Sequence, residues 1–191
     1  MSGPKLFDDD SATPKRSEPQ PDLSSAPPPP EALATRPPSL KDLVEIGRRF
    51  DQLGVEYVLI GGMAMNYHGR ARATEDIDFL VRVTEQNFER IRDALSYLPD
   101  KASLQLDPKT SVQDLSGDYA CVRIADEIVI DLIGHVGDLR FENAGIERKD
   151  YEGIAIRVAD LGTMLRSKQG ITREKDILDR QYLEMLRGGQ R

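Results

Sequence analysis

Prolines divide this chain into two parts that differ in their ability to fold. Ten of the twelve prolines precede Ser39, and serine and charged residues fill much of the remaining sequence there. A segment of this composition buries too little apolar surface to offset the entropy that is lost when a chain becomes ordered. We therefore expect residues 1–38 to form a disordered, proline-rich tail. Binding of these prolines to an aromatic groove on a partner protein is the alternative, and the rarer, role.

Residues 39–191 are numerous enough to form one domain with a hydrophobic core. Across all 191 residues, 33 acidic side chains outnumber 26 basic ones, which gives a net charge of −7. The C-terminal part, residues 161–191, reverses this balance with seven basic and four acidic residues. This distribution argues against nucleic-acid binding over the whole surface, but it suits a site where cations and basic side chains hold a polyphosphate.

The sequence also excludes several classes of protein. Its single cysteine, Cys121, rules out an internal disulfide framework and an all-cysteine zinc site within one chain, and we expect it to be a small core residue. No apolar run approaches the ~18 residues of a membrane-spanning helix. The N-terminus lacks the basic and apolar segments of a secretory signal. A cytoplasmic protein with no membrane partner is therefore expected.

Hydrophobic spacing and capping residues predict a domain of mixed helices and strands. Ser39 and Asp42 form a capping box at the start of a helix, and Gly54 ends that helix. The further elements expected, in chain order, are a strand at Val55–Ile60, a short helix at Met63–His68, a strand at Glu75–Val83, a helix beginning after Thr84, strands at Leu104–Leu106, Asp118–Ala125, Glu127–Ile133 and Ile154–Val158, and helices from about Asp160 and Thr172. The predicted fold class is α/β or α+β, a small mixed β-sheet with helices packed on it.

Three aspartates on two of the expected strands are candidate metal ligands. Asp76 and Asp78 are two positions apart, so both carboxylates face the same way on a strand, and they repel each other unless a proton or cation intervenes. Asp131 lies in an apolar strand where an aliphatic residue would be expected, and burying an unpaired carboxylate costs several kcal/mol. The three carboxylates could converge on two Mg²⁺ ions. A structural ion pair with an arginine is the alternative.

Gly61 and Gly62 directly follow the strand expected at Val55–Ile60. Glycines at the end of a strand let backbone N–H groups approach an anion closely, although a simple tight turn has the same pattern. The combined spacing is more informative than the pair alone. A buried strand, two glycines and thirteen further residues lead to Asp-x-Asp on the next strand.

The run from Leu59 to Val81, LIGGMAMNYHGRARATEDIDFLV, resembles the signature of the polymerase-β-type nucleotidyltransferase superfamily. It is most similar to the branch of AbiEii-like toxins from abortive-infection and toxin–antitoxin systems, and the resemblance covers roughly residues 40–190. Asp131 matches the later strand carboxylate of that branch. The basic C-terminal helix pair of the branch is matched by Lys168, Arg173, Lys175 and Asp176. Gly62 departs from the pattern, because many active transferases have a serine there, and no second domain for an acceptor is evident.

The resemblance implies a nucleotidyltransferase-like fold and a Mg²⁺-dependent enzyme. Such an enzyme moves a nucleoside monophosphate from an NTP to a hydroxyl group of RNA such as tRNA, of a protein or of a small molecule. The implied catalytic residues, which would also hold two Mg²⁺ ions, are Asp76, Asp78 and Asp131. The implied nucleotide-binding residues are Gly61, Gly62, Arg70, Arg72 and Lys168. A toxin-like enzyme would also have a cognate antitoxin as its partner.

Two alternatives to this enzyme remain open. A non-catalytic relative would keep the fold as a nucleotide-binding or regulatory module. Alternatively, the three aspartates are structural and are balanced by Arg70, Arg72 and Arg123, in which case the protein would be indifferent to Mg²⁺.

The assisting residues have structural alternatives too. Lys168, like the arginines at 70 and 72, could be an ordinary solvated charge. Asp176 is expected to pair with Arg173 or Arg180 on its own helix. For His68, His135 and Tyr67, a structural role is favoured over acid–base chemistry or base stacking.

Overall fold

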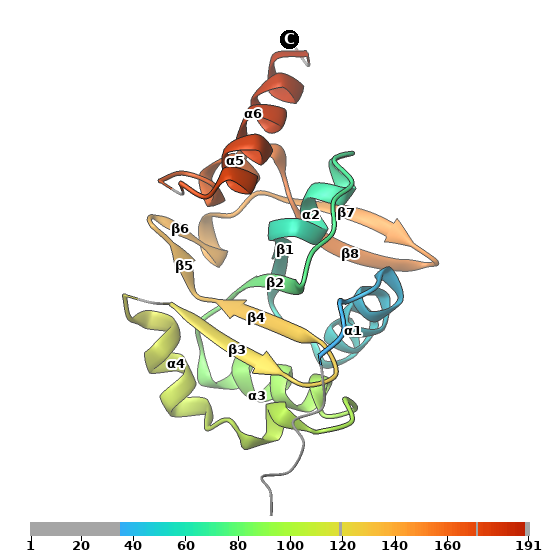
Figure 1. The fold of residues 1–191 in the computed structure, drawn as a ribbon. Helices are drawn as coiled ribbons and strands as arrows, with labels where there is room; N and C mark the ends of the chain where they lie inside the picture. Colours follow the sequence, from blue (N-terminus) through green and yellow to red (C-terminus); the bar gives the residue numbers. More distant parts are fainter. Residues whose placement is uncertain (1–34, 119, 171, 190–191) are drawn as a thin grey trace, which may run out of the picture. The chain divides into compact units, whose positions relative to one another are not determined.

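The computed structural model describes residues 35–118, 120–170 and 172–189, so most of the predicted tail lies outside the described residues. A six-stranded mixed sheet forms the centre of the described part (Figure 1), and the predicted fold class is confirmed. None of the described helices is long and apolar enough to cross a membrane.

The strands follow one another across the sheet in the order β3-β4-β2-β1-β8-β7. Their bounds are β1 Tyr57–Ile60, β2 Asp76–Val81, β3 Cys121–Ala125, β4 Val129–Ile133, β7 Ile146–Tyr151 and β8 Ile154–Ala159. The β2–β4 and β1–β8 pairs are parallel, and the other neighbours are antiparallel. A separate two-stranded ribbon of β5, His135–Val136, and β6, Leu139–Arg140, follows β4.

Six α-helices accompany the sheet in the described residues. They are α1 Leu40–Leu53, α2 Gly61–Tyr67, α3 Glu85–Leu95, α4 Pro108–Ser116, α5 Leu161–Ser167 and α6 Glu174–Gly189. Helix α1 packs on α3, and α3 packs on α4, whereas α5 packs on α6. Figure 1 shows the first group at the lower end of the view and the second group at the upper end. The cavity described below has residues from β1, β2 and β4 on one side and from α5 and α6 on the other.

Alternation along β2 separates the hydrophobic core from the polar face of the sheet. Ile77 and Phe79 are fully buried. Phe79 packs with Phe50 of α1 and Tyr57 of β1 in an aromatic cluster whose ring centroids are 5.0 to 5.3 Å apart. The intervening aspartates therefore point to the opposite face, because successive strand residues alternate in direction.

The start of α1 agrees with the predicted capping box. The Ser39 hydroxyl accepts a hydrogen bond from the backbone N–H of Asp42, and the Asp42 carboxylate accepts one from the backbone N–H of Ser39. Gly54 ends the helix with a φ of +66°, a conformation that favours glycine.

The strand predicted at Leu104–Leu106 is wrong, because residues Ala102–Gln105 form a 3-10 helix. This turn is stabilised from a distance: the Asp126 carboxylate accepts hydrogen bonds from the backbone N–H groups of Asp100 and Ala102. Helix α4 and strand β7 were not predicted. Strand β7 carries charged residues on both faces at one edge of the sheet, so it lacks the hydrophobic alternation of a half-buried strand.

The expectation that Cys121 is a core residue is also wrong, because its side chain is exposed. Buried and exposed positions alternate along β3, and Val122 and Ile124 occupy the buried ones. Cys121 and Arg123 therefore share the other face of this edge strand, beside the polar face of β4.

Candidate active site

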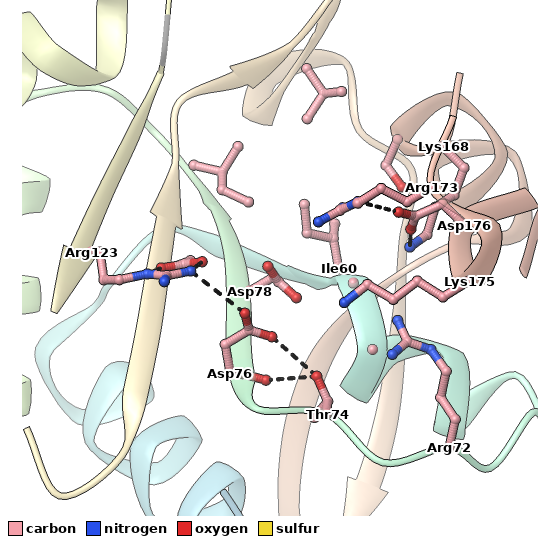
Figure 2. A pocket seen from close by; sticks show the side chains of 16 residues that line it. Ile60, Arg72, Thr74, Asp76, Asp78, Arg123, Lys168, Arg173, Lys175 and Asp176 are labelled. Atoms are coloured by element: carbon pink, nitrogen blue, oxygen red, sulfur yellow. Dashed lines mark hydrogen bonds and ion pairs between the residues drawn. The ribbon is translucent and has the colours of Figure 1, made fainter. Parts of the chain in front are cut away.

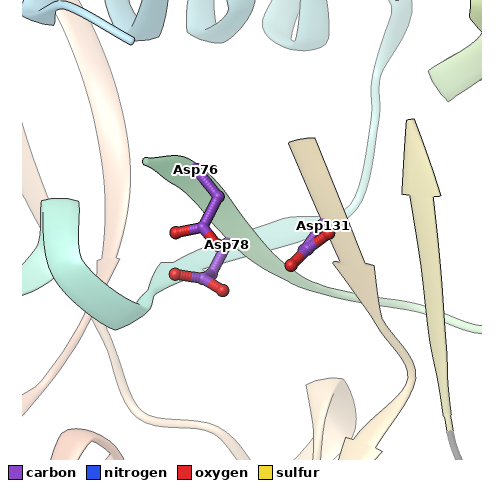
Figure 3. A group of neighbouring side chains, drawn as sticks. All are labelled: Asp76, Asp78 and Asp131. Carbon is purple, nitrogen blue, oxygen red and sulfur yellow. The ribbon is translucent and has the colours of Figure 1, made fainter. Parts of the chain in front are cut away.

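The parallel pairing of β2 and β4 brings the three predicted aspartates together. Asp78 on β2 lies directly opposite Asp131 on β4, and Asp76 is two residues before Asp78 on the same face. Each of the three carboxylates offers one oxygen that lies within 4.8 Å of the others (Figure 3). Three hard oxygen donors at this spacing fit a divalent cation such as Mg²⁺, which prefers carboxylate ligands.

The electrostatic environment of Asp78 also fits a cation. Burial, together with the neighbouring charges of Asp76 and Asp131, raises the pKa of the Asp78 carboxyl to about 6. The shift means that a negative charge at this position is unfavourable without a compensating positive charge. The Thr74 hydroxyl orients the neighbouring carboxylate, since it donates to Oδ1 of Asp76 at 3.1 Å.

One arginine already balances part of this charge. Arg123 donates two hydrogen bonds to Asp131, from Nε at 2.8 Å and from Nη2 at 2.7 Å. Its Nη2 is 3.7 Å from Oδ2 of Asp76. Arg123 is therefore a counter-ion of Asp131, as the structural alternative expects. Arg70 and Arg72, the other two arginines of that alternative, form ion pairs with Asp179 instead.

Gly61 and Gly62 lie directly beside the aspartates. Helix α2 begins at Gly61, whose φ is +64° and whose added Cβ would be 1.8 Å from Oδ2 of Asp78. A Cβ on Gly62 would be 2.5 Å from the hydroxyl oxygen of Thr74. The close packing of Asp78 and Thr74 thus accounts for both glycines.

Carboxylates and basic side chains line opposite sides of one cavity of about 250 Å³ (Figure 2). The acidic side consists of the three aspartates with Arg123 beside them. The basic side consists of Arg72, Lys168, Arg173 and Lys175, with Asp176 among them. Gly61 and Gly62 border the same cavity. An arrangement of this kind can hold a polyphosphate together with its cations.

Lys168 is buried and not the solvated surface charge of the alternative interpretation. Its side chain is 6% exposed, and its Nζ lies 2.5 Å from Asp176 and 3.2 Å from Asp179. Arg173 pairs with Asp176 at 2.7 Å, as predicted for that helix. Burial raises the pKa of the Asp176 carboxyl, but Lys168 and Arg173 outweigh it and keep this pKa below its usual value.

Asp179 is the shared partner of Arg70, Arg72 and Lys168, and the sequence did not single it out. Its side chain is fully buried, and three cations approach it: Arg70 at 3.0 Å, Arg72 at 3.2 Å and Lys168 at 3.2 Å. None of these contacts is aligned as a hydrogen bond, so Asp179 is held by charge. The available signal was its position three residues after Asp176, on the same face of α6.

The histidines and Tyr67 lie apart from this cavity. His68 and His135 each contact a backbone carbonyl oxygen through Nε2, that of Ala159 at 2.8 Å and that of Gly117 at 3.1 Å. The Tyr67 ring packs edge-to-face on Tyr151. These contacts agree with the structural roles favoured for them.

Comparison with known proteins gives a family and one solved structure. The family model described as "Nucleotidyl transferase AbiEii toxin, Type IV TA system" matches residues 46–168, well over half of the chain. No curated protein matches the chain. Among solved structures, the chain is similar to an antigenic nucleotidyltransferase-like protein from Paracoccidioides brasiliensis, with 17% identity over 77% of this chain and 76% of that chain and a TM-score of 0.46.

Proposed function

This chain belongs to the AbiEii family of nucleotidyl transferase toxins, and from that premise we propose that it moves a nucleoside monophosphate from an NTP to a hydroxyl group. The observation that carries the proposal is the single cavity in which three carboxylates face a group of basic side chains across Gly61 and Gly62. Such a cavity has the charge pattern that a nucleotide triphosphate with its metal ions requires.

The three aspartates are the proposed metal ligands. Asp76 and Asp78 would hold one Mg²⁺, and Asp131 would join them in holding a second. Bound Mg²⁺ would supply charge neutralisation for the triphosphate and for the attacking hydroxyl. The protein itself contributes little covalent chemistry in such a transfer, because positioning and electrostatic stabilisation do most of the work.

The remaining residues of the cavity would bind the triphosphate. Backbone N–H groups at Gly61 and Gly62 would lie against the β- and γ-phosphates. Lys168, with Arg70 and Arg72 behind it, would balance their negative charge. The acceptor hydroxyl would attack the α-phosphate in line, and pyrophosphate would leave. RNA such as tRNA, a protein and a small molecule are the acceptors considered. A cognate antitoxin is the proposed partner, and the cytoplasm is the proposed location.

The pairing of Arg123 with Asp131 is the observation that favours the alternative function. In that alternative the chain is a non-catalytic nucleotide-binding or regulatory relative, and the arginine is a permanent counter-ion of the third carboxylate. The two functions differ in their need for a metal, which is therefore the property to measure.

Calorimetric titration of a non-hydrolysable NTP analogue, with Mg²⁺ and again with EDTA, tests the proposal. We expect binding that requires Mg²⁺, that is lost in Asp76→Asn and that is kept in the control Asp93→Asn, which changes an exposed aspartate on α3. Absence of binding in both conditions would contradict the proposal and favour structural aspartates.

Asp78→Asn should abolish transfer of a labelled nucleotide while the far-UV circular dichroism spectrum stays unchanged. Full activity of that variant would show that the metal assignment is wrong.

A further inference from the structure

Arg123 occupies the carboxylate that the second metal ion would need. Strands β3 and β4 are antiparallel, and their register puts Arg123 directly opposite Asp131. The guanidinium donates to both carboxylate oxygens of Asp131, in the two-point geometry that makes arginine–carboxylate pairs strong. Every oxygen that Asp131 could offer to a metal is therefore already bound by one organic cation.

The same guanidinium forms ion pairs with Asp131 and Asp76 and none with Asp78. Its Nη2, which is 2.7 Å from Oδ2 of Asp131, is also 3.7 Å from Oδ2 of Asp76. The contact with Asp76 is drawn in Figure 2. In the part of the chain that the structure describes, no side chain donates a hydrogen bond to Asp78 or forms an ion pair with it. Asp78 thus has no cationic side chain paired with it, Asp76 has one at 3.7 Å, and Asp131 has the closest one, at 2.7 Å.

Arg123 also has space into which it can turn. Its side chain is 60% exposed, compared with 9% for Asp131. It lines a second cavity of about 580 Å³, which Asp76 and Glu75 border together with the basic residues Arg36, Arg173 and Lys175. Because a guanidinium stays protonated at any physiological pH, a metal ion at Asp131 would lie beside a permanent positive charge unless Arg123 turns away.

We propose that Arg123 competes with the second divalent cation for Asp131. The protein without nucleotide then binds one cation tightly, at Asp76 and Asp78, and binds a second one only when Arg123 turns away from Asp131. Arg123 is in this sense a positioning residue that controls how many metal ions the site holds. The inference rests on the proposed function, since it takes the three aspartates as metal ligands.

Binding of Mn²⁺ to the full chain, measured by the electron paramagnetic resonance signal of the free ion, tests this competition. We expect one tightly bound ion per wild-type chain. The variant Arg123→Gln should bind two, with an affinity for the second ion at least tenfold higher than in the wild type. Arg148→Gln is the matched control, because Arg148 is an exposed arginine on β7 at the opposite edge of the same sheet, and it should behave as the wild type.

Two further variants identify the cause of the change. Adding Asp131→Asn to Arg123→Gln should return the count to one, because the second ion then loses its ligand. Arg123→Lys keeps the positive charge but cannot form the two-point contact, so its affinity for the second ion should lie between those of the wild type and Arg123→Gln. This variant carries the test if Arg123→Gln does not fold.

The outcomes separate the inference from the proposed function. Two ions of similar affinity in the wild type, or no change in Arg123→Gln and Arg123→Lys, would contradict the role of Arg123 alone. Absence of Mn²⁺ binding in every variant would contradict the metal site itself, and the proposed function with it.

Discussion

Asp78 lies between two other carboxylates and against the backbone of Gly61, where an added Cβ would be 1.8 Å from its Oδ2. The residue is partly buried there. Burial and the charges of Asp76 and Asp131 accordingly raise its pKa from 3.8 to about 6. In the absence of metal, the folded protein therefore binds a proton at Asp78 more tightly than the unfolded chain does.

The linkage between proton binding and folding predicts the effect of removing this charge. Because the folded-state pKa is raised, the unfolding free energy of the wild type falls as the pH rises from about 4 to about 6, and it stays lower above that range. Asp78→Asn has no ionisable group at this position, so its unfolding free energy does not decrease for this reason as the pH rises. We expect it to be more stable than the wild type at pH 8 by about 1–3 kcal/mol, an upper range set by 1.36 kcal/mol per pKa unit.

Urea denaturation in the presence of EDTA checks this prediction at pH 8 and at pH 3.5. The difference between the two proteins should be large at pH 8 and small at pH 3.5, where Asp78 is protonated in the folded wild type and largely so in the unfolded chain. A variant less stable than the wild type at pH 8 would mean that Asp78 is already compensated without a metal.

At the scale of elements, a buried group of charges joins α6 to the rest of the fold. Asp179 of α6 is fully buried and faces Arg70 and Arg72 from the loop after α2 and Lys168 from the end of α5. Removing one member of a buried ion group leaves the others desolvated and unpaired, which costs more than the loss of a surface ion pair.

Asp179→Asn should therefore lower the unfolding free energy by about 3 kcal/mol. It should also increase amide hydrogen exchange along α6, because the helix loses the charge that the three cations approach. Glu184→Gln is the matched control, since Glu184 is an exposed acid on the same helix. Equal stability of the two variants would show that α6 is held by its apolar contacts alone.

Elements with a strong local signal could be predicted from the sequence. Strand β1 is a short apolar run, β2 and β4 are apolar apart from their aspartates, and α1 has both caps, so each was expected close to its observed bounds. The 3-10 helix at Ala102–Gln105 depends on Asp126, which is distant in the sequence, and was wrongly expected to be a strand. Local sequence patterns cannot show which distant carboxylate will accept hydrogen bonds from the backbone N–H groups of a turn.

The candidate site could likewise be predicted only in part from the sequence. Alternation placed Asp76 and Asp78 on one face, and the parallel pairing of β2 with β4 then brought Asp131 beside them. The partners of the basic residues were not evident, because Arg70 and Arg72 meet Asp179 only through the packing of α6. The partner of Asp131 depended likewise on the register of an edge strand.

At the scale of the whole molecule, one residue before α1 connects two distant parts of the described chain. The Arg36 side chain donates to the carboxylates of Asp42 on α1 and of Glu127 in the turn between β3 and β4. Its backbone N–H donates to the backbone oxygen of Glu127 at 2.9 Å. Hydrogen bonds from Arg36 hold the pKa of the Asp42 carboxyl well below its usual range.

We therefore expect Arg36 to contribute to stability and the residues before 35 to contribute little. Composition predicts a tail at residues 1–38, but the contacts of Arg36 show that the stabilising part of the chain begins before Ser39. Deletion of residues 1–34, which keeps Arg36, should change the melting temperature by about 1 °C or less. Arg36→Gln in the full chain should lower it by a few degrees, because the contacts with Asp42 and Glu127 are lost together. The loss should shrink as the pH falls below the usual pKa range of an aspartate, because the unfolded chain then binds a proton that Asp42, whose pKa is lowered in the folded protein, does not bind.

Differential scanning calorimetry of both variants at pH 7 and at pH 3 measures these effects. The deletion serves as the control for the substitution, since it removes the proline-rich segment but keeps Arg36. A large decrease on deletion would mean that the segment packs on the domain, and the boundary expected from composition would then be wrong. An unchanged melting temperature for Arg36→Gln would instead place the N-terminal limit of the stabilising contacts at Ser39, where the capping box of α1 begins.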